Sequence, residues 1–184
     1  MNPIENLAEY FLKFPGIGPR QARRFVYFLL SSGNAFRKTL ATQILALDNA
    51  VSQCMSCQRF FIRGSNTSPL CDICSSSHTN NTMLLIVEKE TDFDAIKKTN
   101  AYDGRYFILG GSLPILEQNP NEKIRIKELV EEVAKQAENG ELKEIILAMG
   151  ATRDGENTAQ YVAKTLEPLA KKYSLRVSAL GRGL

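Results

Sequence analysis

The 184-residue sequence has no tryptophan, a single histidine and no long apolar run. A mechanism that depends on histidine would therefore rest on His78 alone. No apolar stretch approaches the ~18 residues that a transmembrane helix needs, and Met1–Pro15 lacks the basic region and apolar run of a secretory signal. We therefore expect a soluble, cytoplasmic protein of one domain or two small ones.

The sequence also lacks an excess of basic over acidic residues outside the N-terminal segment. Six basic and three acidic side chains precede Cys54, which leaves 17 of each sign in the rest of the chain. The whole net charge of +3 therefore belongs to the first segment. A local basic excess of this kind favours a polyanionic partner such as DNA.

The first segment is predicted to form two amphipathic helices joined by the sequence PGIGP at 15–19. This is the helix-hairpin-helix pattern. Its glycines, Gly16 and Gly18, let the backbone approach a phosphate, and the following helix offers free N–H groups. Three arginines lie on one face of the first turns of that helix: Arg20, Arg23 and Arg24. Their positions are suitable for contacts with the phosphates of a DNA backbone. The alternative is an ordinary turn with solvated arginines.

A third helix is predicted to begin at about Ala35. Its apolar stripe is interpreted as core: Phe36, Leu40, Ile44, Leu47 and Val51.

Cysteine is scarce as well, and all four cysteines fall within one stretch. They follow the spacing C-x2-C-x13-C-x2-C: Cys54, Cys57, Cys71 and Cys74. Two residues between paired cysteines let both thiolates reach one tetrahedral ion, so the spacing predicts a structural zinc site without an open position. The alternatives are two disulfides, which are disfavoured without export, or four separate buried thiols. The polar stretch 75–82 is interpreted as a linker that carries a surface His78.

The C-terminal half alternates strand and helix patterns. Strands are predicted at 83–87, 106–109, 144–148 and 176–180. Helices are predicted at 92–99, with Thr91 as cap, at 122–139 and at 157–173, the last kinked or split at Pro168. The alternation indicates a parallel sheet with flanking helices, so the fold class is mixed α/β.

Three acidic residues follow the ends of predicted strands, where sites form in parallel sheets. Glu88 ends the first strand, and Asp154 and Glu156 follow the third. Together they can hold Mg²⁺ through carboxylate oxygens, and the arrangement resembles the Toprim domain of topoisomerases and primases. The alternatives are soluble loop acids or contacts with a partner.

The whole chain resembles the RecR family of bacterial recombination mediators. The motifs that carry the resemblance are L-x-x-FPGIGPR at 12–20, C-x-I-C at 71–74, V-E-x-x-x-D at 87–92, L-G-G-x-L at 109–113, I-R-I-x-x-L at 124–129 and G-E-x-T-A at 155–159.

The resemblance implies a non-enzymatic DNA repair protein in three parts: residues 1–53 as the helix-hairpin-helix region, 54–77 as a zinc finger and 78–184 as a Toprim domain. It implies a homotetrameric ring able to encircle DNA, which works with RecO or RecF to load RecA onto gapped or single-stranded DNA. Arg20 and Arg24 match the family's DNA-contacting positions. Glu88, Asp154 and Glu156 match the acidic cluster where RecO is thought to dock.

The sequence departs from the family pattern in three places. Gly150-Ala151-Thr152 stands where the family usually has Asn-Pro-Thr, and Asp154 stands where it commonly has Glu. The sequence ends at Leu184, whereas the family normally continues with a Pro-Gly turn and a further strand and helix. We therefore expect the usual C-terminal segment to be missing.

Two other functions fit the same residues. One is a Mg²⁺-dependent Toprim nuclease or topoisomerase-like enzyme using Glu88, Asp154 and Glu156. Topoisomerases take their tyrosine from a separate domain, whereas Tyr161 and Tyr173 lie on a predicted helix. The other is a protein-interaction module whose basic N-terminal segment binds an acidic partner. The salt dependence of DNA binding separates this module from a DNA-binding protein.

Overall fold

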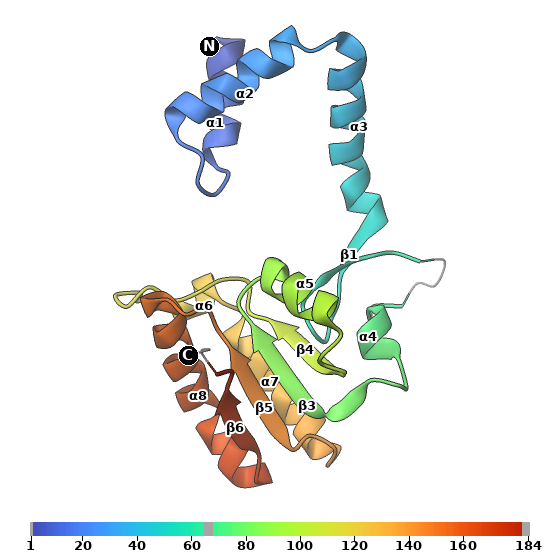
Figure 1. The fold of residues 1–184 in the computed structure, drawn as a ribbon, viewed down its shortest axis with the longest axis vertical. Helices are drawn as coiled ribbons and strands as arrows, with labels where there is room; N and C mark the ends of the chain where they lie inside the picture. The colour runs from blue at the N-terminus through green and yellow to red at the C-terminus, as the bar shows by residue number, and fades with distance from the viewer. Residues whose placement is uncertain (1, 65–67, 182–184) are drawn as a thin grey trace. The chain divides into compact units, whose positions relative to one another are not determined.

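The computed structural model describes residues 2–64 and 68–181. The chain divides into two compact units, Met1–Ala50 and Val51–Leu184, which are described separately (Figure 1). Unit 1 is helical, and unit 2 contains the four cysteines and a parallel sheet with flanking helices. The predicted mixed α/β class is therefore confirmed. In the described part of the chain, no helix combines the length and the apolar character needed to span a membrane.

Unit 1 consists of three helices: α1 (Pro3–Leu12), α2 (Pro19–Ser31) and α3 (Asn34–Ala50). The side chain of Asn2 caps α1 by accepting a hydrogen bond from the Ile4 N–H at 3.0 Å. Between α1 and α2, Gly16 has a φ of +76°, a conformation that L side chains rarely adopt. The two helices pack on one another through buried small residues: Ala8, Ala22 and Val26.

The prediction that the apolar stripe of α3 belongs to the core is wrong. No described residue of α3 is buried, and Ile44 and Leu47 are each 57% exposed. Val51 belongs to the first strand of unit 2. Leu40 and Ile44 line an apolar groove of about 620 Å³ together with residues of α1 and α2 such as Leu7 and Leu29. A 50-residue helical unit has too little apolar surface to close a full core over a third helix.

Unit 2 begins with a short antiparallel pair, β1 (Val51–Gln53) and β2 (Phe60–Ile62), followed by α4 (Asp72–Ser75). The sequence RFFIR at 59–63, between the cysteine pairs, is typical of a short strand, and β2 confirms it. The polar stretch 64–69 after it predicts a turn, but its residues 65–67 lie outside the described residues, as do 182–184 at the chain end.

The sheet has the order β4-β3-β5-β6, and all three strand pairs are parallel, as predicted. Its strands are β3 (Asn80–Val87), β4 (Gly104–Ile108), β5 (Glu144–Ala148) and β6 (Arg176–Ala179). The strand β3 is longer than expected, so the end of the predicted linker is part of it. Thr82 accepts a hydrogen bond from the Lys143 N–H at 2.9 Å, which extends the pairing toward β5.

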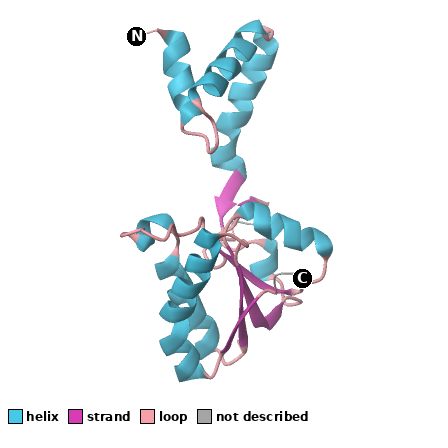
Figure 2. Cartoon of the chain, turned by 60° about the vertical axis from the view of Figure 1, so that its left-hand side comes forward, coloured by secondary structure: helices cyan, strands magenta, loops and turns pink. Residues whose placement is uncertain are grey.

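The two faces of the sheet are covered differently, and helices lie on both sides (Figure 2). One face packs on α7 (Ile126–Glu138) and α8 (Arg153–Tyr173) through residues such as Ile86, Leu129 and Val162. The other face packs on α5 (Glu90–Thr99) and on all four cysteines, through residues such as Val87 and Phe93. The cysteine module is therefore part of the core of unit 2.

The helix predicted at 122–139 is two helices, α6 (Pro120–Lys123) and α7. Ile124 and Arg125 interrupt it. Ile124 is only 3% exposed, and Arg125 donates its N–H to the Leu109 carbonyl at 2.8 Å. Burial and this bond to the end of β4 outweigh the local helical pattern.

Two helix starts also differ from the predictions. The helix α5 begins at Glu90, because the Asp92 carboxylate accepts a hydrogen bond from the Lys89 N–H at 2.9 Å, so Thr91 is not the cap. The helix α8 begins at Arg153, where Thr152 accepts a hydrogen bond from the Gly155 N–H at 3.0 Å. It continues through Pro168 to Tyr173, so the predicted split there is wrong.

Candidate metal centre and nucleic-acid surface

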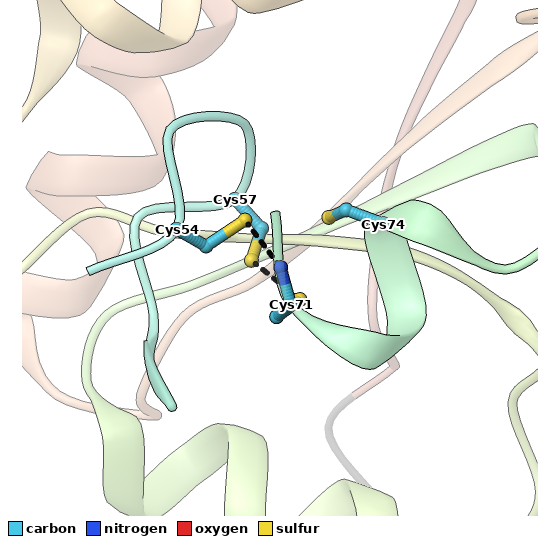
Figure 3. A group of neighbouring side chains, drawn as sticks. All are labelled: Cys54, Cys57, Cys71 and Cys74. Carbon is cyan, nitrogen blue, oxygen red and sulfur yellow. Dashed lines mark hydrogen bonds between the residues drawn. The ribbon is translucent and has the colours of Figure 1, made fainter. Parts of the chain in front are cut away.

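The four cysteines meet at one point, although they come from two segments (Figure 3). Cys54 and Cys57 lie in the turn after β1, Cys71 precedes α4, and Cys74 lies within it. All four are at most 6% exposed. Their Sγ atoms lie within 4.8 Å of one another, and no other group of three or more His, Cys, Asp or Glu side chains in residues 2–64 and 68–181 is so arranged. Four buried sulfur donors at this spacing fit one tetrahedral metal ion.

The turn that carries the first pair is fixed by backbone hydrogen bonds. Gln58 donates its N–H to the Cys54 carbonyl at 3.0 Å, and Cys54 donates to the Arg59 carbonyl at 2.8 Å. Gln58 takes the left-handed conformation, with a φ of +62°. The backbone N–H of Cys71 also donates to the Cys54 sulfur at 3.4 Å. These bonds fix the turn and hold the Cys54 sulfur against the residue that precedes α4.

Two of the four cysteines, Cys54 and Cys71, favour the thiolate even before a metal binds. Hydrogen bonding from the Cys57 thiol lowers the pKa of Cys54 to about 6. Hydrogen bonds from the Cys54 and Cys57 thiols lower the pKa of Cys71 as well. The pKa values of Cys57 and Cys74 are raised, because both share protons with these neighbours. A bound cation would replace the remaining protons, so binding would release them to solution.

A positive side chain that the sequence analysis missed lies beside the thiolates. Arg59 has only 13% of its side chain exposed and forms an ion pair with Asp72. Its guanidinium carbon lies 4.9 Å from the centre of the Phe93 ring. Burial alone would lower the pKa of Arg59, but the hydrogen bond and charge of Cys71 raise it. An arginine two residues after a C-x2-C pair is the signal that could have suggested this role.

The cysteine module is bound to the sheet and its helices by hydrogen bonds. Ile108 at the end of β4 donates its N–H to the Cys57 carbonyl at 2.9 Å. Ser56 donates to Glu132 of α7 at 2.5 Å. The Phe60 N–H donates to the carboxylate of Glu90 at 2.8 Å. A metal ion held by the four cysteines would therefore be coupled to three elements of unit 2 at once.

A second candidate surface lies on α2 in unit 1. The three arginines predicted to contact DNA lie on one helical face with Pro19 and Tyr27, and the five residues line a hollow of about 500 Å³. Arg24 donates to the Gln21 side chain at 3.1 Å. Arg20 and Arg23 form no hydrogen bond or ion pair with any described residue. Two guanidinium groups are thus free for an anion.

The two hairpin glycines differ in what they contribute. A Cβ atom at either Gly16 or Gly18 would meet nothing within 4 Å. Only Gly16 has a positive φ, and Gly18 is the extended residue before α2. Their surroundings are open, so a phosphate can approach this backbone.

The predicted acidic residues lie at the carboxyl edge of the sheet but do not converge. Glu88 is 7% exposed, and its Oε1 atom has no hydrogen-bond partner in the described structure. Burial raises the pKa of Glu88. Asp154 and Glu156 lie in the first turn of α8. The carboxylate oxygens of the three do not form a compact group as the sulfur atoms do.

The loop between Gly150 and Gly155 brings the start of α8 against Glu88. A Cβ atom on Gly155 would lie 2.0 Å from the Gly150 carbonyl oxygen and 3.1 Å from Glu88 Oε1. Only glycine permits this approach. The glycine of the Gly-Glu pair therefore has a packing function beside the buried carboxylate.

A parallel sheet of order β4-β3-β5-β6 with a buried glutamate after β3 and acids after β5 defines a Toprim protein, and residues 82–180 match the family model described as "Toprim domain". Over 181 residues, 98% of this chain, it is 34% identical to "Recombination protein RecR" of Chloroherpeton thalassium and 34% identical to that of Cereibacter sphaeroides. It is 29% identical to that of Lactobacillus helveticus over 182 residues. These alignments cover 84–85% of the relatives' lengths. The chain belongs to the RecR family.

Proposed function

We propose that the protein is a DNA-binding recombination mediator that performs no catalysis itself. The observation that carries this proposal is the basic face of α2, where two arginines have no partner among the described residues. A relative named as a recombination protein aligns with 98% of the chain. Contacts from arginine to phosphate position a protein on DNA without reading sequence.

The proposal assigns a role to each part of the chain. Residues 1–53 bind DNA through Arg20, Arg23 and Arg24 and the backbone at Gly16 and Gly18. Residues 54–77 hold one structural Zn²⁺ through the four cysteines, because four thiolates without an open position are typical of structural zinc. Residues 78–184 form the Toprim part. The family resemblance supports a cytoplasmic setting for these activities.

The acidic edge of the Toprim part is proposed as a docking surface for RecO, RecF or both, which would place RecA on gapped or single-stranded DNA. Asp154 and Glu156 lie in the first turn of α8, next to Glu88. A carboxylate set that does not converge on one point suits a protein partner better than a tightly held Mg²⁺ ion.

Self-association belongs to the same proposal. The groove between α1, α2 and α3 is about 620 Å³ and almost wholly apolar. Apolar surface of this kind on a small unit marks an interface. The family resemblance implies a ring of identical subunits, so the proposed occupant of the groove is a second copy of the chain.

The first experiment uses labelled gapped DNA with Mg²⁺, divided between a native and a denaturing gel. A shifted and uncut strand is the expected result. A cut strand, lost on addition of a chelator, would overturn the mediator proposal and make Glu88, Asp154 and Glu156 catalytic.

The second experiment replaces Arg20 and Arg24 by alanine. DNA binding should weaken, and the slope of log K against log salt should flatten by about two. The matched control replaces Lys97 and Lys98, two exposed basic residues of α5, and should leave binding unchanged. Equal affinity of the Arg20 and Arg24 double variant and the wild type at low salt would remove the hairpin from the DNA site.

A further inference from the structure

Tyr27 is an aromatic residue on the arginine face that nothing in unit 1 uses. Tyr27 lies seven residues after Arg20, four after Arg23 and three after Arg24. Its side chain therefore shares one stripe of α2 with the three arginines. Its exposed fraction is 56%. It lines the same hollow as the arginines.

The other aromatic residues of unit 1 have contacts that account for them. Phe11 packs edge to face on Phe14 and Phe25, at 5.7 and 5.5 Å between ring centres. Phe28 and Phe36 form a third such pair at 5.7 Å, and Lys13 lies 5.2 Å from the centre of the Tyr10 ring. Within the described residues, Tyr27 has no ring contact, cation contact or hydrogen bond.

We propose that Tyr27 is a stacking platform for an unpaired base, which makes the arginine face select DNA with single-stranded character. The arginines would hold consecutive phosphates while the ring receives a base face beside them. Stacking of a base on an aromatic ring is tolerant of sequence. A fully paired duplex keeps its bases stacked inside and presents only phosphates to the same face. This inference rests on the proposed DNA-binding function and adds the form of DNA that the site prefers.

The residues that line the hollow favour a single DNA strand as its ligand over a second protein chain. The hollow combines one ring with three guanidinium groups and contains no acidic residue. The apolar groove, by contrast, is lined mainly by Leu, Ile and Phe side chains and includes a single charged residue, Arg37. A positively charged hollow with a free ring fits an anionic strand with flat bases, whereas the apolar groove fits a helix of another copy.

The test compares Tyr27→Ala with the wild type on a labelled oligo-dT strand and on a duplex of equal length. The expected result is about a tenfold loss of affinity for the single strand, within the range for one base stacked on an aromatic ring, and less than a twofold change for the duplex. Tyr27→Phe keeps the ring and should retain single-strand affinity. Phe60→Ala, which removes a 54% exposed aromatic residue of unit 2, should change neither.

Other outcomes would overturn either the stacking role of Tyr27 or the proposed DNA-binding function. Equal losses on both DNA forms, or no loss on the single strand, would overturn the stacking role. A change in sedimentation of Tyr27→Ala without DNA would also overturn it, because the ring would then pack against another copy. If the Arg20 and Arg24 double variant binds DNA like the wild type, the proposed function fails, whatever Tyr27 does.

Discussion

At the scale of single residues, Arg59 is placed to balance the charge of the proposed zinc site. One Zn²⁺ ion with four thiolates would leave two negative charges in a buried place, which is costly without a counter-charge. The guanidinium group lies between Asp72, Phe93 and the sulfur atoms and is mostly buried. Its role resembles that of the outer partners that orient and stabilise metal ligands.

We expect Arg59→Met to weaken zinc binding by about tenfold, because outer partners of metal ligands contribute at that level. Competition with a chromogenic chelator measures the change. Arg59→Lys keeps the charge and should recover part of the affinity. Arg63→Met, an exposed arginine in the same module, is the control, and an equal loss in that variant would argue against a specific role for Arg59.

Glu88 should make stability depend on pH in an unusual direction. Its folded-state pKa is raised above the ordinary 4.5 by burial, so the folded protein holds this proton more tightly than the unfolded chain. The contribution of Glu88 to stability is therefore full below pH 4.5 and is lost as pH rises through the folded pKa. We expect Glu88→Gln to be more stable than the wild type at pH 7 and equal to it near pH 4.

Denaturant titrations at the two pH values check this expectation. Glu131→Gln, an exposed glutamate of α7, is the control and should show little difference at either pH. A Glu88→Gln variant that is less stable at pH 7 would mean that the charged carboxylate makes favourable contacts in the folded state.

At the scale of elements, the start of α8 depends on the absence of a side chain at Gly155. Gly155→Ala places a carbon 2.0 Å from the Gly150 carbonyl oxygen, so the loop or the helix must move. We expect a loss of about 3 kcal/mol in the free energy of unfolding, at the upper end for overpacking. Gly33→Ala, where a Cβ meets nothing within 4 Å, is the control. Equal thermal unfolding of the two variants would contradict the packing role.

The elements that the sequence predicts well are those whose signal is local. The apolar run 83–87 and the strand 144–148 are both present, because strands buried on two faces need continuous apolar residues. The break at Ile124 and Arg125 was missed, since it depends on a bond to Leu109 at the end of another strand. The stripe of α3 is amphipathic in sequence, but periodicity does not reveal whether a partner covers it.

The candidate sites, too, were predicted from the sequence only where their signal is local. The cysteines were found because two pairs at fixed spacing carry their geometry in the sequence, and the arginine face follows from helical spacing alone. Arg59 and Tyr27 could not be singled out from the sequence. A single arginine or tyrosine has no spacing pattern, so its role emerges only from what surrounds it in space.

At the scale of the whole molecule, the exposed groove of unit 1 should control self-association. Leu40→Glu with Ile44→Glu places two charges among apolar walls, and charge is depleted at the centre of interfaces. We expect this variant to sediment as a smaller species than the wild type with its helical content intact. Leu116→Glu, an 88% exposed leucine outside the groove, is the control. Unchanged sedimentation of the double variant would remove the groove from the interface.

The strand order has a consequence for how the chain folds while it is being synthesised. The first strand of the sheet to leave the ribosome, β3, is a central strand, and it pairs with β4 and with β5, whose residues begin only at Glu144. Its last four residues are buried in the finished protein, so they stay exposed while about sixty more residues are made. The four cysteines are all synthesised before β3. Metal binding by the four cysteines at this stage would place an ordered module beside the unpaired strand and would limit aggregation of its apolar run.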